Sequence, residues 1–315
     1  MNIQYLNFED SIKTLDLQIQ ELLTLSSKKG INYNPEIRSL QKRRVSSLQK
    51  IYKNLTPWEI IQVARHPQRP ILEDYLEHLV IDFKELHGDK CFGDDRALIT
   101  GLGEIENEKV LILGHNKGKK IDDNITRNFG SPHPEGYRKA LQKMKFAEKF
   151  RIPIISFIDT PGAYPGLGSE ERGVARAISE NLLSMSILKV PIICIIIGEG
   201  GSGGALGIGV GDKLSMLEFS YYSVISPEGG AAILGKDIKY AEEMAKSLKL
   251  TSSELLKLDL VDEVIKEPIG GAQRSHHDIM YSVRKYILRT LRGLKRVKIE
   301  NLLENRYKKL RNVGK

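Results

Sequence analysis

The feature that most constrains the fold is a run of glycine directly after an apolar segment. Seven of the twelve residues at 198–209 are glycine, and residues 191–197 are all Pro, Cys or Ile. A short, continuous apolar run predicts a strand that is buried on both faces. Glycine is unfavourable inside regular structure but lets the backbone turn sharply or approach another group closely. In α/β proteins such loops follow the carboxyl ends of strands, where ligands bind, so we expect a site here.

A second loop has the same position one strand earlier. The apolar run 153–158 leads into Asp159, Thr160, Pro161 and Gly162, and a helix is expected over 168–188. If the two strands are neighbours, the two loops lie side by side. Together they would form a cleft floored by backbone N–H groups.

Strands and helices alternate along most of the chain. Apolar runs predict strands at 97–105, 110–115, 153–158, 191–197, 214–218, 222–225 and 261–265. Helical periodicity predicts helices at 57–65, 71–86, 134–150, 168–188, 227–248 and 251–258. This alternation indicates an α/β fold with a mostly parallel sheet. A doubly wound sheet and a spiral of strand–strand–helix turns both fit the rhythm.

The two ends of the chain differ from this central part. Residues 8–54 predict two polar helices with narrow apolar stripes, and residues 276–314 predict two amphipathic basic helices. We therefore expect an N-terminal helical hairpin at 1–55, a core at 56–268 and C-terminal helices at 269–315.

Composition limits the function classes. The 315 residues carry a net charge of +8, and clusters at 42–44 and 306–309 are interpreted as solvated helix faces, since no nucleic-acid-binding signature accompanies them. Two cysteines, Cys91 and Cys194, allow neither a disulfide framework nor a four-cysteine metal site, and Cys194 is expected in the core. The chain begins without a secretion signal and contains no apolar run long enough for a membrane span. We expect a cytoplasmic protein.

The glycine run satisfies two familiar side-chain patterns. Gly198, Gly200 and Gly203 have the spacing of a dinucleotide fingerprint, with Glu218 at the expected distance for a ribose carboxylate. The helix after them is short and rich in glycine, which disfavours this interpretation. Gly200-x-Ser202-x-Gly204 matches a nucleophile elbow; a hydrolase triad would take Asp262 and then His276 or His277. Nothing in the sequence indicates that these histidines fold back onto the serine.

A third interpretation needs no side chain. Adjacent glycines at the start of a helix expose backbone N–H groups that suit a developing oxyanion. Short glycine patterns match many motifs by chance, so the three interpretations remain open on this segment alone.

Seven stretches in order along the chain resemble one family. They are 65–70 (RHPQRP), 127–130 (RNFG), 134–140 (PEGYRKA), 157–166 (FIDTPGAYPG), 170–173 (EERG), 198–206 (GEGGSGGAL) and 224–229 (VISPEG). Together they closely resemble the alpha subunits of the bacterial and plastid-type acetyl-CoA carboxylase carboxyltransferase. The resemblance implies a crotonase-like spiral of strand–strand–helix turns with helical extensions at both ends.

The resemblance also implies an activity and partners. Such a subunit acts with a zinc-ribbon beta subunit in an α2β2 heterotetramer and transfers a carboxyl group from carboxybiotin to acetyl-CoA. The product is malonyl-CoA, in the first committed step of fatty acid synthesis. Biotin arrives on a separate biotin carboxyl carrier protein, charged by a biotin carboxylase, and the alpha chain itself needs no metal. The location would be the cytoplasm, or the plastid stroma in a plastid-bearing organism.

The implied site consists of backbone. We expect the N–H groups of Gly203 and Gly204 to hold the biotin oxygen, because the transfer needs no protein nucleophile. Further substrate-binding positions are expected at Gly162, Ala163, Gly200, Gly201 and Ser202. Glycine is expected there because a side chain would fill the space that the biotin ring enters.

The sequence gives less support for a catalytic or binding role of the side chains near these loops. His115 and His133 would suit acid–base catalysis, but biotin itself can act as the base. Arg172 and Arg176 lie one turn apart and would face either the cleft or solvent, where Glu170 or Glu180 would pair with them. The competing functions are a crotonase-type acyl-CoA enzyme that acts alone and a non-catalytic scaffold.

Overall fold

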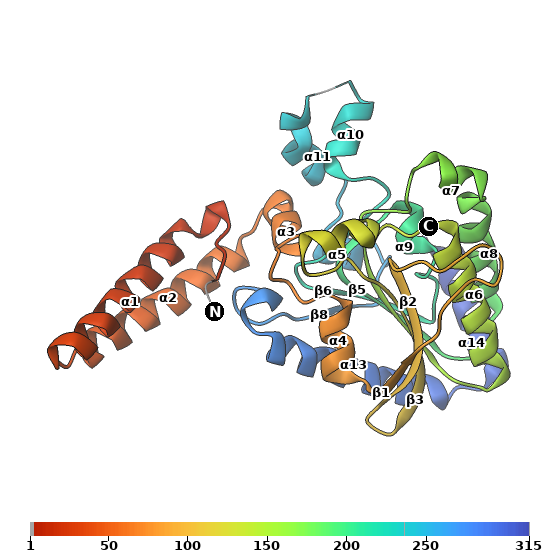
Figure 1. Cartoon of the computed structure of the whole chain (residues 1–315), viewed down its shortest axis with the longest axis horizontal. Helices are drawn as coiled ribbons and strands as arrows, with labels where there is room; N and C mark the ends of the chain where they lie inside the picture. Colours follow the sequence, from red (N-terminus) through yellow and green to blue (C-terminus); the bar gives the residue numbers. More distant parts are fainter. Residues whose placement is uncertain (1–2, 236, 315) are drawn as a thin grey trace.

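The computed structural model describes residues 3–235 and 237–314. Within them an eight-stranded sheet organises the chain (Figure 1), in the order β1–β2–β3–β4–β5–β6–β8, with β7 beside β5. The first three strands pair antiparallel, and the neighbours from β3 onwards pair parallel. The strands are β1 (Ile81–Glu85), β2 (Leu98–Ile105), β3 (Glu108–His115), β4 (Ile154–Thr160), β5 (Ile192–Gly201), β6 (Lys213–Leu217), β7 (Tyr221–Ser223) and β8 (Glu263–Ile265).

Helices cover both faces of the sheet. Along β5, Ile192, Cys194 and Ile196 pack in one buried cluster with residues of α6 (Pro134–Lys149) and α8 (Val174–Ile187). The alternate residues of β5 pack in a second cluster with α4 (Leu72–Leu79) and α13 (His276–Lys295). Because both faces are buried, the parallel strands are continuously apolar rather than alternating. This confirms the α/β fold with a largely parallel sheet and the core position of Cys194.

Strand β5 is longer than predicted and lies in the interior of the sheet, between β4 and β6. The first half of β5 pairs with β6, and residues 199–201 pair with β7, so two short strands share one side of it. On its other side β4 pairs with β5 from Ile154 up to Thr160, which lies opposite Gly200. The carboxyl ends of β4 and β5 therefore meet at one edge of the sheet, as the two-loop prediction requires.

Three predicted helices are corrected by the structure. The helix expected at 71–86 ends at Leu79, and β1 follows as an exposed edge strand after Val80 takes an extended conformation. The helix expected at 168–188 consists of α7 (Leu167–Glu171) and α8, separated at Gly173, whose φ is +76°. The helix expected at 227–248 is interrupted after α10 (Pro227–Ile233) and resumes in α11 (Ala241–Ser247). In the last two cases a glycine lies at or near the break.

Several short elements complete the described chain. They are α3 (Pro57–Ala64), α5 (Ile121–Thr126), α9 (Ser202–Leu206), α12 (Ser252–Lys257) and four 3-10 turns, η1 (Asn7–Glu9), η2 (Asn128–Gly130), η3 (Ile238–Tyr240) and η4 (Ala272–Arg274). Of these, α5, η2 and η4 were not predicted. The first two matter below because η2 packs beside β4.

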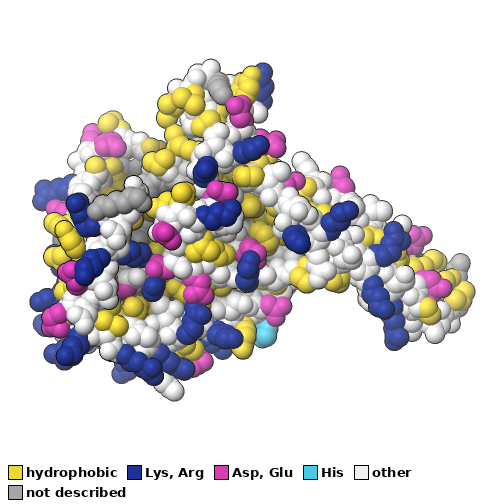
Figure 2. Space-filling view, turned by 180° about the vertical axis from the view of Figure 1, so that it is seen from behind, with side chains coloured by type: hydrophobic (Ala, Val, Ile, Leu, Met, Phe, Trp, Pro, Cys, Tyr) yellow, Lys and Arg dark blue, Asp and Glu magenta, His cyan; other side chains and the backbone are white. Residues whose placement is uncertain are grey.

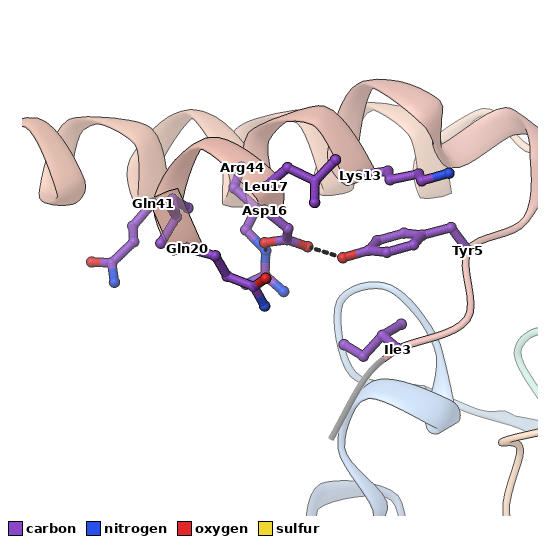
Figure 3. Close-up of a pocket in the computed structure, with 9 residues that line it drawn as sticks. Ile3, Tyr5, Lys13, Asp16, Leu17, Gln20, Gln41 and Arg44 are labelled. Carbon is purple, nitrogen blue, oxygen red and sulfur yellow. Dashed lines mark hydrogen bonds and ion pairs between the residues drawn. The ribbon is translucent and has the colours of Figure 1, made fainter. Parts of the chain in front are cut away.

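The N-terminal helices form a hairpin that projects from the core (Figure 1). It consists of α1 (Asp10–Lys29) and α2 (Asn34–Lys53), with Gly30 at a φ of +65° after the first helix. Figure 3 shows the pocket beside its base, where the segment before α1 lies against both helices. There the Tyr5 hydroxyl donates to Asp16 (2.8 Å), and Arg44 pairs with the same carboxylate (2.5 Å).

The last helix, α14 (Ile299–Asn312), is attached by a buried arginine. Arg306 donates to both oxygens of Asp212 and to the carbonyls of Met185, Leu188 and Val190, at 2.8–2.9 Å. The cluster at 306–309 is thus only partly a solvated face. Figure 2 shows Lys and Arg side chains spread over the face of the molecule that is seen from behind. No helix in the described ranges combines the length and apolarity that crossing a membrane requires.

Candidate functional site

The two glycine loops are in direct contact at the carboxyl ends of β4 and β5. A Cβ atom at Gly204 would lie 2.5 Å from the Ala163 nitrogen, and one at Gly201 would overlap the carbonyl of Pro161. Only a residue without a Cβ allows the loops to approach this closely. Glycine at 201 and 204 is therefore required by loop–loop packing, a reason different from the open space that we expected at Gly204.

Open space lies instead beside Gly203 and Gly162. A Cβ at Gly203 would meet its nearest neighbour, Ile178 Cδ1, at 3.6 Å, and one at Gly162 would lie 3.9 Å from Ser202 Cβ. The N–H groups of Gly203 and Gly204 donate to no acceptor in the described part of the chain, whereas the N–H of Gly162 donates to Thr160 Oγ1 (3.1 Å). Two neighbouring amides, one on half-buried Gly203 and one on buried Gly204, thus have no acceptor among the described residues.

Ser202 lies between these glycines in a strained conformation. Its φ is +51° and its side chain is exposed at the junction of β5 and α9, as in a nucleophile elbow. The candidate partners lie elsewhere. His276 contacts the Gln68 carbonyl, and His277 is exposed beside Asp278. Asp262 pairs with Lys213 and Lys309. The predicted triad is therefore not brought together.

The dinucleotide interpretation also lacks its geometry. Gly198 and Gly200 lie within β5 rather than in a loop after it, and Gly200 pairs with Tyr222 of β7. Glu218 forms an ion pair with Lys266 (2.6 Å) and accepts from the Glu267 N–H (3.2 Å). The glycines that precede Gly203 are thus part of the sheet.

A buried ionic network lies beneath the loops and was not predicted from sequence. Lys117, just after β3, donates to Asp159 of β4 (2.7 Å) and to Glu199 of β5 (2.5 Å). Asp159 also accepts the backbone N–H of Glu199 (2.8 Å). The network joins the carboxyl ends of three adjacent strands and fixes the position of the carboxyl end of β5.

The network continues to the neighbouring helices through Arg65, the residue after α3. Its guanidinium donates to Glu199 (2.7 Å), to Glu228 of α10 (2.6 Å) and to the Tyr221 hydroxyl (3.0 Å). Burial alone would raise the pKa of Glu199, but the charges of Lys117 and Arg65 lower it to about 2. Tyr221 donates to the same carboxylate (2.5 Å), and burial raises the pKa of that phenol. Glu199 is therefore ionised at neutral pH.

A local signal for this network was present in the sequence. Asp159 and Glu199 each follow five or more apolar positions of a buried strand, and Lys117 follows the strand before them. Charged side chains at the ends of adjacent parallel strands must be paired when they are buried. The identity of each partner could not be predicted, because residues 117 and 199 are far apart in sequence.

Of the other predicted side chains, three have structural partners, whereas neither ring nitrogen of His115 has a hydrogen-bond partner among the described residues. His115 is fully buried behind the loops, near the Gly204 backbone, and burial lowers its pKa to about 3, so it is neutral. His133 contacts the Ser169 hydroxyl (2.8 Å) and the Tyr164 ring. Arg172 donates to Glu135 (2.8 Å), while Arg176 pairs with Glu180 on an exposed helix face. No three His, Cys, Asp or Glu side chains of residues 3–235 and 237–314 are grouped as a metal site would require.

Sequence comparison identifies full-length relatives. The family described as "Acetyl co-enzyme A carboxylase carboxyltransferase-like" matches residues 5–314. The "Acetyl-coenzyme A carboxylase carboxyl transferase subunit alpha" of Histophilus somni is 50% identical over 315 residues, which is 100% of this chain and 99% of that protein. The protein of the same name from Rhodopirellula baltica is 50% identical over 309 residues, covering 98% and 97%.

Solved structures share the fold at low sequence identity. A transcarboxylase 12S structure with methylmalonyl-coenzyme A matches 69% of this chain with a TM-score of 0.55 and 21% identity; the match spans 42% of that chain. A Pseudomonas malonate decarboxylase hetero-tetramer in complex with coenzyme A matches 68% of this chain and 86% of its own, with a TM-score of 0.55 and 15% identity. The shared fold confirms the expected crotonase-like spiral rather than a doubly wound sheet.

Proposed function

The chain belongs to the family of acetyl-CoA carboxylase carboxyltransferase alpha subunits, and we propose that it supplies the carboxybiotin half of a carboxyltransferase site. The product of the complete site is malonyl-CoA, formed from acetyl-CoA. The observation that carries the proposal is the pair of unpaired amides at Gly203 and Gly204, beside a space that glycine leaves open.

The chemistry needs stabilised negative charge rather than a nucleophilic side chain. Carboxybiotin, a substrate carried on another protein, releases CO2 and is left with negative charge on its ureido oxygen. The biotin anion then takes a methyl proton from acetyl-CoA, and the resulting enolate attacks the CO2 to give malonyl-CoA. The N–H groups of Gly203 and Gly204 donate to the ureido oxygen from fixed positions, which lowers the barrier more than mobile water would. Gly162 and Ala163 form the opposite wall, and Gly200 and Gly201 position the amide pair at the end of β5.

The ionic network supports this arrangement by keeping the loops fixed. Glu199 directly precedes Gly200 and is held by Lys117, Arg65 and Tyr221. A donor pair that is already oriented needs no reorganisation during the reaction. The residues of the network therefore contribute to the reaction by fixing the position of the loops.

The remaining components are other proteins. We propose a zinc-ribbon beta subunit that supplies the acetyl-CoA pocket within an α2β2 heterotetramer. A biotin carboxyl carrier protein delivers the carboxybiotin that a biotin carboxylase has charged. The relatives are named as an alpha subunit, which supports an assembly with other subunits.

The test is a pair of variants at adjacent positions. Gly203→Val places a side chain in the open space, where the nearest atom leaves room for a Cβ, so the protein is expected to fold. The added isopropyl group should block the approach of the ureido oxygen to the two amides, so carboxyl transfer in complex with the beta subunit should fall about 10²–10³-fold, as it does when an oxyanion donor is lost. Ser202→Ala should retain activity within about threefold, because no step uses the hydroxyl.

Two outcomes would contradict the proposal. Full activity of Gly203→Val would rule out the amide pair, and an inactive but folded Ser202→Ala would support a serine nucleophile. Malonyl-CoA formation should also require the mixture of alpha and beta chains. Turnover by this chain alone would identify a self-sufficient acyl-CoA enzyme.

A further inference from the structure

A turn of left-handed backbone lies beside the loop that carries Gly162. Asn128, Phe129 and Gly130, the residues of η2, have φ angles of +47°, +53° and +79°. Glycine adopts this conformation freely and asparagine tolerates it, but a bulky residue such as phenylalanine is strained there. Such strain persists only where surrounding interactions enforce it, and it is concentrated at functional sites.

The interactions that enforce the turn are present on both sides. Arg127 donates to Glu73 of α4 (2.8 Å) and to the Arg96 carbonyl (3.2 Å), which anchors the end of α5. Gly130 and Ser131 donate back to the carbonyls of Arg127 and Asn128, at 2.8 and 2.9 Å. The turn is thus a fixed part of the fold.

The turn is in contact with the loop that carries Gly162. A Cβ at Gly130 would lie 3.0 Å from the Asp159 carbonyl and 2.8 Å from Lys117 Cγ. Two residues further on, the Pro132 carbonyl accepts the N–H of Tyr164 (2.9 Å). The backbone of the turn is therefore held against the loop that carries Gly162.

Phe129 is 56% exposed. Neither packing nor backbone conformation accounts for an aromatic residue at this position, because the ring is not buried and the conformation would suit glycine better. The glycine loops, in turn, provide backbone donors but little apolar surface. A pocket for a flat organic ring needs both.

We propose that Phe129 is a substrate-contact residue whose ring packs against the fused rings of biotin and excludes water beside the amide pair. This inference rests on the proposed function, since it assigns a wall of the same site. The strained turn then presents the ring at the rim of the cleft, and Arg127 is a positioning residue that keeps it there.

The experiment measures the reverse reaction, from malonyl-CoA and free biotin, with the complex of this chain and its beta subunit. Phe129→Ala should raise KM for biotin about tenfold, the loss expected for one aromatic contact. KM for malonyl-CoA should stay within about twofold and kcat within about threefold. If Phe129 had only a structural role, its substitution would change the KM values for biotin and malonyl-CoA together.

Two further variants serve as controls. Phe150 has the same exposed fraction, 56%, but lies after α6, close to the start of β4 at the opposite edge of the sheet, so Phe150→Ala should leave both KM values unchanged. Phe129→Gly also removes the ring but relieves the strain. It should bind biotin as weakly as Phe129→Ala and resist urea better, which separates ligand contact from stability.

The outcomes distinguish this inference from the function on which it rests. An unchanged KM for biotin in Phe129→Ala, with Gly203→Val inactive, would overturn the role of Phe129 and leave the proposed function standing. A parallel change in both KM values would also overturn it, as would loss of activity that follows loss of stability. Absence of carboxyl transfer by the unaltered complex would overturn both.

Discussion

At the scale of single residues, the candidate site depends on charges that are buried only because they are paired. Glu199 faces two cations, Lys117 and Arg65, and Lys117 faces a second carboxylate, Asp159. Removing one member of such a network leaves its partner buried and unpaired, which costs far more than an exposed ion pair contributes. The network therefore links the stability of the chain to the geometry of its glycine loops.

We predict a pH-dependent loss of stability for Glu199→Gln. The folded-state pKa of Glu199, about 2, lies below its ordinary value of 4.5. Its contribution is therefore complete above pH 4.5 and disappears as the pH falls towards 2. From 1.4 kcal/mol per pKa unit, that contribution is about 3 kcal/mol. Urea unfolding at several pH values between 7 and 3 should show wild type and variant converging as the pH falls.

Glu180→Gln provides the matched control. Glu180 pairs with Arg176, whose side chain is 84% exposed, so this change should leave the free energy of unfolding nearly unchanged at any pH. A Glu199→Gln deficit that is constant from pH 7 to pH 3 would contradict the linkage.

Sequence reasoning reached the glycine loops but not this network. The loops are local: a buried strand followed by several glycines indicates a close backbone approach wherever it occurs. The requirement for glycine at 204, by contrast, comes from Ala163 in the loop after β4. The partners of Glu199 come from three further elements, and periodicity contains no information about which elements meet.

At the scale of elements, α14 shows how a surface helix is attached to a core. Its sequence predicted an amphipathic basic helix, and the structure confirms the helix. The attachment uses one arginine, Arg306, which is fully buried and donates five hydrogen bonds. An arginine can satisfy so many acceptors because its five N–H groups form a rigid fork.

Arg306→Leu should destabilise the chain by about 3–5 kcal/mol, because Asp212 and three carbonyls would lose their donor. Thermal or urea unfolding measures this directly. Arg311→Leu, at an exposed position of the same helix, should change stability by less than about 0.5 kcal/mol. The double variant Arg306→Met, Asp212→Asn should recover part of the loss, since no unpaired charge remains. Equal stabilities of the two single variants would contradict the role of Arg306.

The boundaries of elements were predicted less well than their existence. The strands of the parallel sheet were found because they are buried on both faces and uniformly apolar. Strand β1 was missed because most of its residues are exposed at the edge of the sheet, so its sequence lacks that pattern. The break at Gly173 interrupts a segment whose composition suits a continuous helix. Its cause is the backbone conformation, which periodicity does not reveal.

At the scale of the whole molecule, the core and its projecting hairpin differ in how they are stabilised. The core has two large buried clusters, one on each face of the sheet. In the hairpin, buried apolar residues such as Ile12, Leu48 and Tyr52 lie near its base, where they join a smaller cluster with Phe219.

The order of strands and helices in the sequence did not decide the arrangement of the sheet, because the same order is common to the spiral and the doubly wound sheet.

We predict that the tip of the hairpin opens independently of the core. Residues 22–36 should exchange their amide hydrogens at least about 10³-fold faster than β4 and β5, because few buried contacts resist local opening there. Hydrogen-exchange mass spectrometry at pH 7 measures both regions in one sample. Equal protection of the tip and the central strands would show that the hairpin unfolds only with the core.

The same projection affects how the molecule moves through solvent. The hairpin extends well away from the core in Figure 1, so the particle has a larger frictional coefficient than a sphere of equal mass. A single chain of 35.5 kDa should therefore elute early from a size-exclusion column, at the position of a heavier globular standard. Light scattering, which reports mass independently of shape, is the appropriate way to count the chains in any assembly that this protein forms.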